Sequence, residues 1–358
     1  MVLSASPSPA VPPPSGAPAP AGGTPPLRKP YLDGTAALRD RLRTSLRHST
    51  ADGMHDLRFR ALGTQCQVQW IARDAAHRAL GATIIEWMAG FEATYSRYLP
   101  GSLISQINAA AGTARVAIDA ETERLFALCD QLHFLSRGAF DPTALPLLQL
   151  WDWKAARPTI PSDDAIAAAR RLVGWRRVQR GPGWVFLPEA GMGLDLGGMG
   201  KEFAVDYVAE MLARAGVPGG LVDFGADVRV VGLPADGRPG WHVGLDDPRQ
   251  PGRCWRGLGL KSGAVATSGD YIRRFELGGR RFGHILDLRT GRPVDNGCLG
   301  VSVVAPTCTQ AGLLSTSAFV LGPDEGLRLI EAQYGTAGAI VTTDAILTSR
   351  QFHTYVAS

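Results

Sequence analysis

A glycine-rich turn that runs directly into a helix constrains this chain more than any other segment. Residues 194–206 read LDLGGMGKEFAVD, and the pattern predicts that a helix begins near Lys201. Gly197, Gly198 and Gly200 let the main chain approach a ligand closely because they carry no side chain. The first turn of the helix adds free N–H groups and the positive end of the helix dipole. The segment therefore predicts a cradle for a diphosphate.

The remaining pattern mixes helices and strands without a strict alternation of the two. A strand is predicted over residues 59–71, where apolar residues alternate with glutamines. Apolar spacings of three and four predict helices over residues 75–95, 122–136 and 201–215. Further strands are predicted over residues 220–231, 241–245 and 301–305. We therefore expect an α+β fold with mixed or antiparallel sheets and packed helices, and not a Rossmann sheet.

The N-terminal segment has a different composition from the rest. Residues 1–30 are rich in Pro, Ala, Ser and Gly, which predicts disorder or polyproline II structure. We expect residues 1–55 to form a disordered segment and linker, and residues 56–358 to form one folded domain. The start lacks the basic and apolar stretches of a secretory signal and an early cysteine for lipid attachment. The sequence thus favours a cytoplasmic location, or a periplasmic one if the true start differs.

Charge, length and cysteine content narrow the class of protein. A chain of 358 residues with 45% hydrophobic content can bury one large core or two smaller ones. The net charge of +4, without a basic block, gives little reason to expect a nucleic-acid partner. No stretch reaches the roughly 18 to 20 apolar residues needed to span a bilayer. The five cysteines form no CxxC pair or zinc-like spacing, so we assign them no chemistry and expect them buried or partly buried.

A series of motifs occurs in one order along the chain. They read RALGTQCQVQW, YSRYLPGSLISQIN, GAFDPTALPLLQLW, LDLGGMGKEFAVD, LVDFGADVRVVG, AVATSGDYIRRF, GHILDLRTGRPV and VSVVAPTCTQAGLLSTSAFVLG. Each is weak alone, but the ordered set resembles the ApbE family of FAD:protein FMN transferases over about residues 59–338. The resemblance implies that FMN is moved from FAD onto a threonine of a partner protein, with release of AMP and dependence on Mg²⁺. It also implies an acceptor that is a subunit or domain of a redox enzyme.

The resemblance further implies a set of FAD contacts. These residues are Leu62, Tyr98, Ala139, Phe140, Asp141, Asp195, Lys201 and Leu286. Tyr98 can stack on the isoalloxazine ring, and Leu286 is expected to contribute by packing. Lys201 can neutralise charge on the pyrophosphate. Because the helix dipole disfavours a cation at this end, the position of Lys201 indicates an anion nearby.

Structural alternatives stay open for several of these positions. Leu62 can be a simple core residue. Asp141 and Thr143 can cap the following helix, with the preceding phenylalanine in the core. Asp195 can hold its own turn through main-chain N–H groups. Lys201 can be a solvated lysine of a first helical turn.

His284 is the candidate general base that the resemblance implies for the incoming hydroxyl group. The ordinary histidine pKa of about 6.5 suits proton acceptance near neutrality. The alternative is a histidine at the end of a strand that hydrogen-bonds to the main chain.

The metal site is where the chain departs from the family. The resemblance implies ligands from an A-D-x-x-x-T motif and from a main-chain oxygen of the glycine turn. Here the motif reads AGLLST, so Gly312 stands at the aspartate position, while Thr316 and the Gly198 carbonyl are present. Losing the only carboxylate should weaken Mg²⁺ binding, and Gly312→Asp should then raise the affinity. Phosphate oxygens of FAD, Asp270 or Asp295 are possible replacements.

Two further departures lie close to these motifs. Glu202 replaces the glycine that is usual after the lysine, and Ala226 replaces the second glycine of the VDFGADV segment, where its methyl group can crowd a cofactor. The intact motifs favour an active FMN transferase, whereas these substitutions and Gly312 favour an FAD-binding relative that acts as a carrier or accessory factor. Hydrolysis of FAD to FMN and AMP is a third hypothesis.

Overall fold

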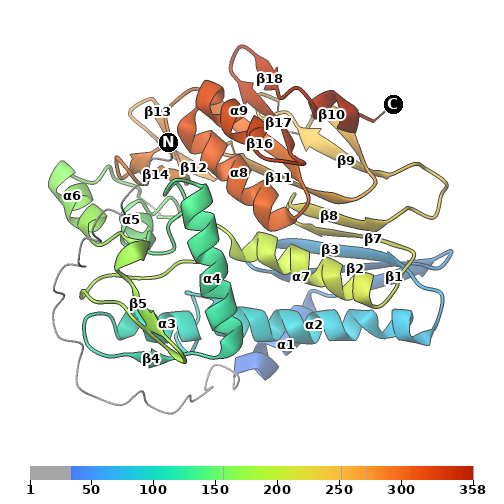
Figure 1. Cartoon of the computed structure of the whole chain (residues 1–358), viewed down its shortest axis with the longest axis horizontal. Coiled ribbons are helices and arrows are strands. Elements are labelled where there is room, and N and C mark those ends of the chain that lie inside the picture. Colours follow the sequence, from blue (N-terminus) through green and yellow to red (C-terminus); the bar gives the residue numbers. More distant parts are fainter. Residues whose placement is uncertain (1–33, 156, 251, 272, 358) are drawn as a thin grey trace, which may run out of the picture.

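One antiparallel sheet organises the molecule (Figure 1). The structure, a computed structural model, describes residues 34–155, 157–250, 252–271 and 273–357. Within those ranges, nine strands form the main sheet, and every neighbouring pair is antiparallel. In sheet order they are β1 (Arg47–Ala51), β2 (Met54–Ala61), β3 (Thr64–Ile71), β7 (Gly219–Phe224), β8 (Val228–Gly232), β11 (Gly263–Gly269), β16 (Cys298–Ala305), β17 (Ala337–Thr342) and β18 (Ile346–Thr348). The predicted α+β class is confirmed.

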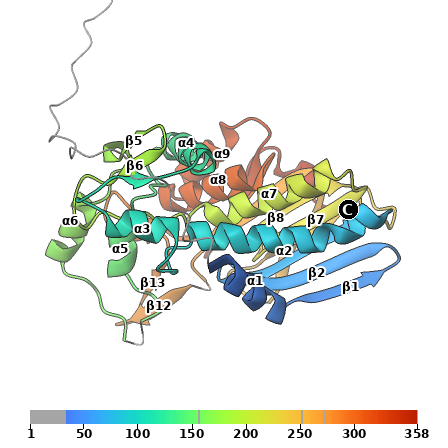
Figure 2. The same ribbon diagram turned by 90° about the horizontal axis from the view of Figure 1, so that it is seen from below.

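The two faces of the sheet are covered differently. Helices lie on one face: α1 (Thr35–Thr44), α2 (Ala75–Tyr95), α7 (Gly200–Arg214), α8 (Cys308–Leu321) and α9 (Pro323–Glu331). Figure 2 shows α2 and α7 side by side in front of β7 and β8. Val68 and Val222 are among the buried strand residues that face these helices. On the opposite face, the ribbon of β9 (Trp241–Asp246) and β10 (Cys254–Leu260) packs with η3 (Phe352–Tyr355) against Val228 and Val230.

A smaller region adjoins one end of the helical layer (Figure 1). Its elements are α3 (Leu103–Ala109), β4 (Val116–Ala117), α4 (Ala120–Leu135), α5 (Leu145–Leu150), α6 (Asp163–Arg171), η2 (Trp175–Arg177), β5 (Gln179–Gly181) and β6 (Trp184–Phe186). The short hairpins β12 (Arg274–Leu277) with β13 (Arg280–Gly283) and β14 (Leu286–Asp287) with β15 (Arg292–Pro293) pack on α5 and α6 through a separate apolar cluster. Among the described residues, no helix is long and apolar enough to cross a membrane.

The predicted helices agree with the structure more closely than the predicted strands. Helix α2 has the predicted bounds, and α4 and α7 differ by one or two residues at their ends. Residues 59–71 and 220–231, each predicted as one strand, instead form hairpins. The chain of the first hairpin reverses at Leu62 and Gly63, where φ is 51° and 72°. The chain of the second hairpin reverses at Gly225 and Ala226, where φ is 66° and 71°. Two successive positive φ angles reverse the chain tightly.

The folded part begins before residue 56, so the predicted boundary is wrong for residues 34–55. Helix α1 and strand β1 lie in that range, and β1 pairs with β2. Leu38 and Leu42, four residues apart on one helical face, are buried in the main core. The polar composition of α1 hid this face. Residues 1–33 lie outside the described part of the chain.

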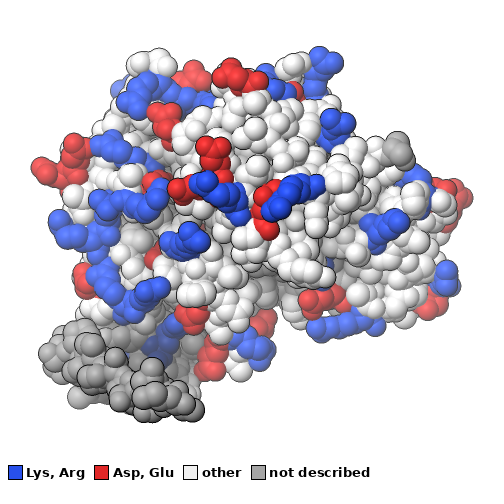
Figure 3. Space-filling model, turned by 45° about the horizontal axis from the view of Figure 1, so that its top comes forward, with Lys and Arg blue, Asp and Glu red and all other residues white. Residues whose placement is uncertain are grey.

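Charged side chains of both signs are interspersed over the face shown in Figure 3, in agreement with the small net charge of the chain.

All five cysteines are free. Four of them are buried as expected, and burial raises the pKa of the Cys66, Cys129 and Cys298 thiols to about 12. Cys254 is exposed at the edge of the β9–β10 ribbon, where the sequence predicted a buried or partly buried side chain.

Candidate functional site

The glycine turn before α7 is braced by Asp195. Its Oδ1 accepts a hydrogen bond from the Gly197 N–H group at 2.6 Å, and its Oδ2 lies 2.5 Å from Arg97 Nε. The Asp195 N–H group donates to the Pro142 carbonyl at 2.8 Å. Asp195 therefore holds its own turn, which is the alternative that the sequence left open. It also holds Arg97, a cation that the sequence did not single out.

The carboxylate of Asp141 is engaged by its own loop. Oδ1 accepts hydrogen bonds from the Thr143 N–H group at 2.8 Å and from the Thr143 hydroxyl at 2.5 Å. Oδ2 accepts from the Trp175 N–H group at 3.0 Å, and His133 Nδ1 lies 3.6 Å away. These contacts shape the loop that ends in α5. A contact of Asp141 with FAD stays a prediction.

Phe140 joins this loop to the glycine turn. Its ring packs so closely under Gly198 that a Cβ atom at residue 198 would lie 3.3 Å from it. Phe140 is buried in the main core, and Ala139 packs against the cluster beneath α8. Gly198 itself is exposed. The GAFDPT and LDLGGMG motifs thus form one surface on which the main chain of the turn is accessible.

Tyr98 presents its ring beside two cations. Its side chain is 68% exposed, the Arg97 guanidinium lies 4.2 Å from the ring centroid, and Arg97 Nη2 donates to the Tyr98 hydroxyl at 2.9 Å. On the same ring, Lys154 Nζ lies 5.5 Å from the centroid. An exposed aromatic ring beside positive charge suits a ligand that combines a flat ring with phosphates.

His284 follows β13, and its ring is oriented by the main chain. Its N–H group donates to the Arg273 carbonyl at 3.0 Å, and its Nδ1 lies 3.2 Å from the same oxygen. Because a carbonyl only accepts, Nδ1 carries the proton and Nε2 keeps a free lone pair. Burial, and then the charge of Arg273, lower the pKa of His284 from 6.5 to about 4. The ring is therefore neutral at pH 7.

Trp153 and Lys154 connect the Tyr98 and His284 positions. The Trp153 ring lies 6.2 Å from the His284 ring, and Lys154 Nζ lies 5.1 Å from the Trp153 ring. Neither residue was predicted as a site residue from the sequence. A signal was available, because WDWK begins at the last residue of the GAFDPTALPLLQLW motif and combines two tryptophans with a lysine.

Lys201 is not a solvated lysine, because it forms an ion pair with the Asp227 carboxylate. Asp227 is only 2% exposed and was not singled out by the sequence. The anion expected beside Lys201 is thus, in this structure, a protein carboxylate. A second carboxylate oxygen, Glu202 Oε1, lies 4.0 Å from Lys201 Nζ.

Asp206 fixes how α7 packs on α8. Its Oδ1 accepts from the Cys308 N–H group at 2.7 Å, and its Oδ2 accepts from the Thr309 N–H group at 2.8 Å and from the Thr309 hydroxyl at 2.7 Å. Arg229 Nη1 lies 2.8 Å from Oδ1. A carboxylate at the start of a helix satisfies free N–H groups and the helix dipole. The contact sets the register of the two helices.

One turn from this contact, Glu202 faces Gly312. A Cβ atom at residue 312 would lie 2.5 Å from Glu202 Cγ and 3.1 Å from its Oε1, so the Glu202 side chain fills the space beside the glycine. Each of the two alternative carboxylates pairs with an arginine, while Asp270 Oδ1 is also buried without a hydrogen-bond partner among the described residues. Asp270 Oδ2 lies 3.1 Å from Arg281 Nε, and Asp295 Oδ2 lies 3.4 Å from Arg280 Nη2.

Thr316 lies one further turn along α8. Its hydroxyl shares a hydrogen bond of 2.9 Å with the Ser268 hydroxyl, which also meets Ser315 Oγ at 2.8 Å. Within the described ranges, no three His, Cys, Asp or Glu side chains gather as a metal centre. A cation here would therefore depend on few charged ligands.

Leu62 and Leu286 are packed residues in this structure. Leu62 lies in the turn between β2 and β3 and packs against the main core, as the alternative for this residue states. Leu286 is 6% exposed and belongs to the cluster that joins α5 and α6 to the short hairpins. Their predicted contacts with FAD stay predictions.

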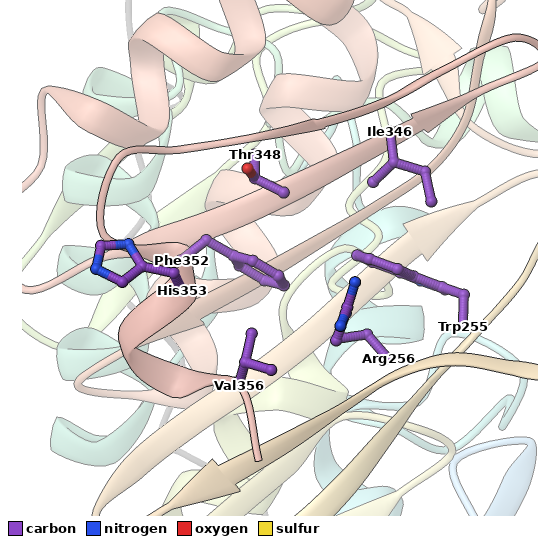
Figure 4. A pocket seen from close by; sticks show the side chains of 7 residues that line it. All are labelled: Trp255, Arg256, Ile346, Thr348, Phe352, His353 and Val356. Carbon is purple, nitrogen blue, oxygen red and sulfur yellow. The ribbon is translucent and has the colours of Figure 1, made fainter. Parts of the chain in front are cut away.

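Two cavities lie on the other face of the sheet. One of about 490 Å³ is lined by Trp255, Arg256, Ile346, Thr348, Phe352, His353 and Val356 (Figure 4). The other, of about 450 Å³, lies between the sheet and the β9–β10 ribbon and includes Asp223 and Ala226. Burial raises the pKa of the Asp223 carboxyl group. Of the residues singled out by the sequence, only Ala226 lines either cavity.

Known proteins match the chain over most of its length. Residues 62–341 match the model of the ApbE family. A FAD:protein FMN transferase of Treponema pallidum is 32% identical over 304 residues, which covers 79% of this chain and 83% of that protein. Its counterpart from Vibrio cholerae is 30% identical over 289 residues, covering 79% of this chain and 86% of that protein.

Solved structures agree with these sequence matches. The ApbE protein of Thermotoga maritima superposes with a TM-score of 0.78 at 30% identity, covering 87% of this chain and all of that one. The Pseudomonas stutzeri flavinyl transferase ApbE gives a TM-score of 0.75 at 27% identity, covering 87% of this chain and 98% of that one. The chain therefore belongs to the ApbE family.

Proposed function

We propose that this chain is a FAD:protein FMN transferase that attaches FMN to a threonine of an acceptor protein and releases AMP. The relatives at 30% and 32% identity carry that activity in their names. The observation that carries the proposal is His284, whose neutral ring keeps a free Nε2 while Nδ1 bonds to the Arg273 carbonyl. Such a ring can accept the proton of an incoming hydroxyl group.

In the proposed reaction, the threonine Oγ attacks the FAD phosphorus nearer the riboflavin. A new P–O bond forms to the threonine, the bond from that phosphorus to the bridging oxygen breaks, and AMP leaves with that oxygen. The hydroxyl proton passes to His284 Nε2. Its pKa of about 4 makes it a weak base in the free protein, and the negative pyrophosphate would raise that pKa on binding.

The surface around the glycine turn suits FAD. Tyr98 and Trp153 offer aromatic faces, and the cationic groups of Arg97 and Lys154 lie beside the Tyr98 ring. The exposed turn at Gly197 and Gly198 leads into α7. The N–H groups of Gly197, Met199 and Gly200 are bonded within the turn, so the next N–H groups at the start of α7 are the ones that would favour phosphate. We infer that the flavin lies by Tyr98 and the pyrophosphate by the turn.

The residues present fit a divalent cation, with a set of ligands that differs from the family motif. Glu202 is buried, its Oε2 has no hydrogen-bond partner among the described residues, and Gly312 leaves room for this side chain. Glu202, the Thr316 hydroxyl and the Gly198 carbonyl would hold the ion. Bound Mg²⁺ would neutralise charge on the transferred phosphoryl group and on the departing AMP.

Gly312 and the strained Ala226 favour a second candidate, an FAD-binding protein without transfer. Incubation with FAD, Mg²⁺ and an acceptor fragment, followed by intact-mass spectrometry of the fragment, separates the two. The proposal predicts the addition of one FMN to the fragment and one AMP released per FMN added. AMP and free FMN without a modified fragment would indicate hydrolysis, and bound, unchanged FAD would indicate a carrier.

His284→Asn tests the base. We expect loss of transfer with FAD affinity retained, as measured by quenching of flavin fluorescence. His353→Asn is the matched control, because His353 lies in the cavity of Figure 4 on the opposite face of the sheet. Equal loss of binding and transfer in His284→Asn would make this histidine structural.

A further inference from the structure

We propose that Glu202, on α7, supplies the anionic metal ligand that the family motif places at residue 312, on α8. This inference rests on the proposed function, because the cation it concerns is the one that would assist FMN transfer. It differs from the family pattern in the ligand residue and in the helix that carries it. Four features of the structure lead to it.

The first feature is space. Gly312 is buried, and a Cβ atom there would lie 2.5 Å from Glu202 Cγ, a separation that real Cβ atoms do not tolerate. A carboxylate side chain at residue 312 and the present Glu202 conformer therefore cannot coexist. The Glu202 carboxylate, whose Oε1 would lie 3.1 Å from that Cβ, already occupies the region that an aspartate at residue 312 would enter.

The second feature is an unsatisfied charge. Glu202 is 9% exposed, and its Oε2 is buried without a hydrogen-bond partner in the described part of the chain. A buried polar atom left without a partner costs about 1 to 3 kcal/mol, and more when it is charged. Lys201 offsets only part of this cost, because its Nζ is 4.0 Å from Oε1 and is paired with Asp227. A cation at Oε2 would satisfy the remaining oxygen.

The third feature is helix register. Asp206 on α7 meets Cys308 and Thr309 on α8, and Glu202, one turn earlier, meets Gly312, one turn later. The two helices are therefore antiparallel along this contact. Thr316 lies one turn beyond Gly312 on the same face of α8, and the glycine turn directly precedes α7, because residues four apart share a helix face. In the proposed site, the Thr316 hydroxyl and the Gly198 carbonyl would complete the ligand set of Glu202 at the α7–α8 seam, which is the contact surface between these two helices.

The fourth feature is chemistry. Mg²⁺ binds through one or two carboxylates together with waters and substrate phosphates, so one carboxylate per site is enough when FAD is bound. This chain has a carboxylate at residue 202 and a glycine at residue 312. Relative to the pattern that the family resemblance implies, the two have exchanged places, which would keep the number of carboxylates at the α7–α8 seam. The extra methylene of glutamate lets α7 reach the position beside Gly312.

The competing explanation is that Glu202 serves only as a counterion for Lys201. Titration calorimetry with Mn²⁺ in the presence of FAD separates the two. Glu202→Gln keeps the size of the side chain and removes its charge, and we expect the Mn²⁺ affinity to fall about tenfold or more, since affinity follows ligand charge. Glu210→Gln, on the exposed side of the same helix, is the matched control and should bind Mn²⁺ as the wild type does.

The reciprocal exchange gives the sharper test. In contrast to the expectation from the sequence, Gly312→Asp alone should not tighten metal binding and should lower the melting temperature, because its Cβ collides with Glu202. Glu202→Gly combined with Gly312→Asp should restore both the affinity and the melting temperature. Far-ultraviolet circular dichroism confirms that each variant is folded, and the isosteric Glu202→Gln variant keeps the test available if the glycine variant unfolds.

Wild-type Mn²⁺ affinity in Glu202→Gln would overturn the proposal, and so would tighter binding in Gly312→Asp alone. Transfer activity is measured separately by mass spectrometry. The expected Mn²⁺ pattern without FMN transfer would refute the proposed function and leave the ligand assignment standing. FMN transfer by the wild type, together with an unchanged Mn²⁺ affinity in Glu202→Gln, would support the proposed function and refute the ligand assignment.

Discussion

Replacing Asp206 by alanine tests whether the α7–α8 seam depends on one buried carboxylate. Asp206 is 8% exposed and accepts three hydrogen bonds from Cys308 and Thr309, at 2.7 to 2.8 Å, while pairing with Arg229 at 2.8 Å. Hydrogen bonds to a charged acceptor contribute about 1.5 to 3 kcal/mol each, and breaking a buried ion pair costs about 3 to 5 kcal/mol in total. These contributions share partners and do not add. We therefore expect the free energy of unfolding to fall by about 3 to 5 kcal/mol.

The assay is urea unfolding followed by tryptophan fluorescence and circular dichroism, with linear extrapolation to water. Glu210→Ala is the control, because Glu210 is one turn from Asp206 and lies 3.8 Å from the same Arg229, but its side chain is 48% exposed. An exposed pair of this kind contributes less than about 1 kcal/mol. A loss below about 1 kcal/mol in Asp206→Ala, or a loss equal to that of the control, would refute the reasoning.

Three other variants test local features. Ala226→Gly should raise the free energy of unfolding by about 0.5 to 1 kcal/mol, because φ is 71° at this residue; a lower value in urea would contradict the strain. His284 has a lowered pKa in the fold, so the unfolded chain binds the proton first and stability should fall as the pH drops from 6.5 to about 4. His284→Asn should flatten this part of a stability–pH curve, and an unchanged slope would count against it. Tyr98→Ala should weaken FAD binding about 3- to 10-fold by flavin fluorescence, while Tyr98→Phe should retain most of it; equal affinity in the alanine variant would exclude stacking.

Elements whose pattern has one strong period were predictable from the sequence. Helix α2 was predicted with its observed bounds, and the alternation of Cys66, Val68 and Trp70 in β3 matches their burial. The two hairpins were not separated into strands, because their turns lack the usual Asn-Gly or Asp-Gly pair. Leu62 and Ala226 each take a positive φ that non-glycine residues rarely adopt, so the local signal favoured a continuous strand.

The candidate site was predictable in its motifs but not in its partnerships. The glycine turn, Tyr98 and His284 came from recognisable segments. Arg97 and Asp227 did not, although each pairs with a residue that had been singled out. Such ion pairs join residues far apart in the chain, and one sequence holds no record of which carboxylate approaches which cation. The charge conflict of Lys201 at a helix start indicated a partner without identifying it.

Gly312, considered alone, suggests that a metal ligand has been lost. Viewed along the sequence, a ligand position without a side chain indicates a weakened metal site, and Glu202 is an unrelated substitution in a distant motif. The seam changes this interpretation, because Asp206 fixes the register of α7 on α8 and brings the two substitutions face to face. Each substitution alone is unfavourable. Glu202 needs the space beside Gly312, and Gly312 without Glu202 would leave the proposed metal site without a carboxylate. Only their combination preserves both packing and charge, which is why the double exchange, and not either single variant, is the decisive comparison.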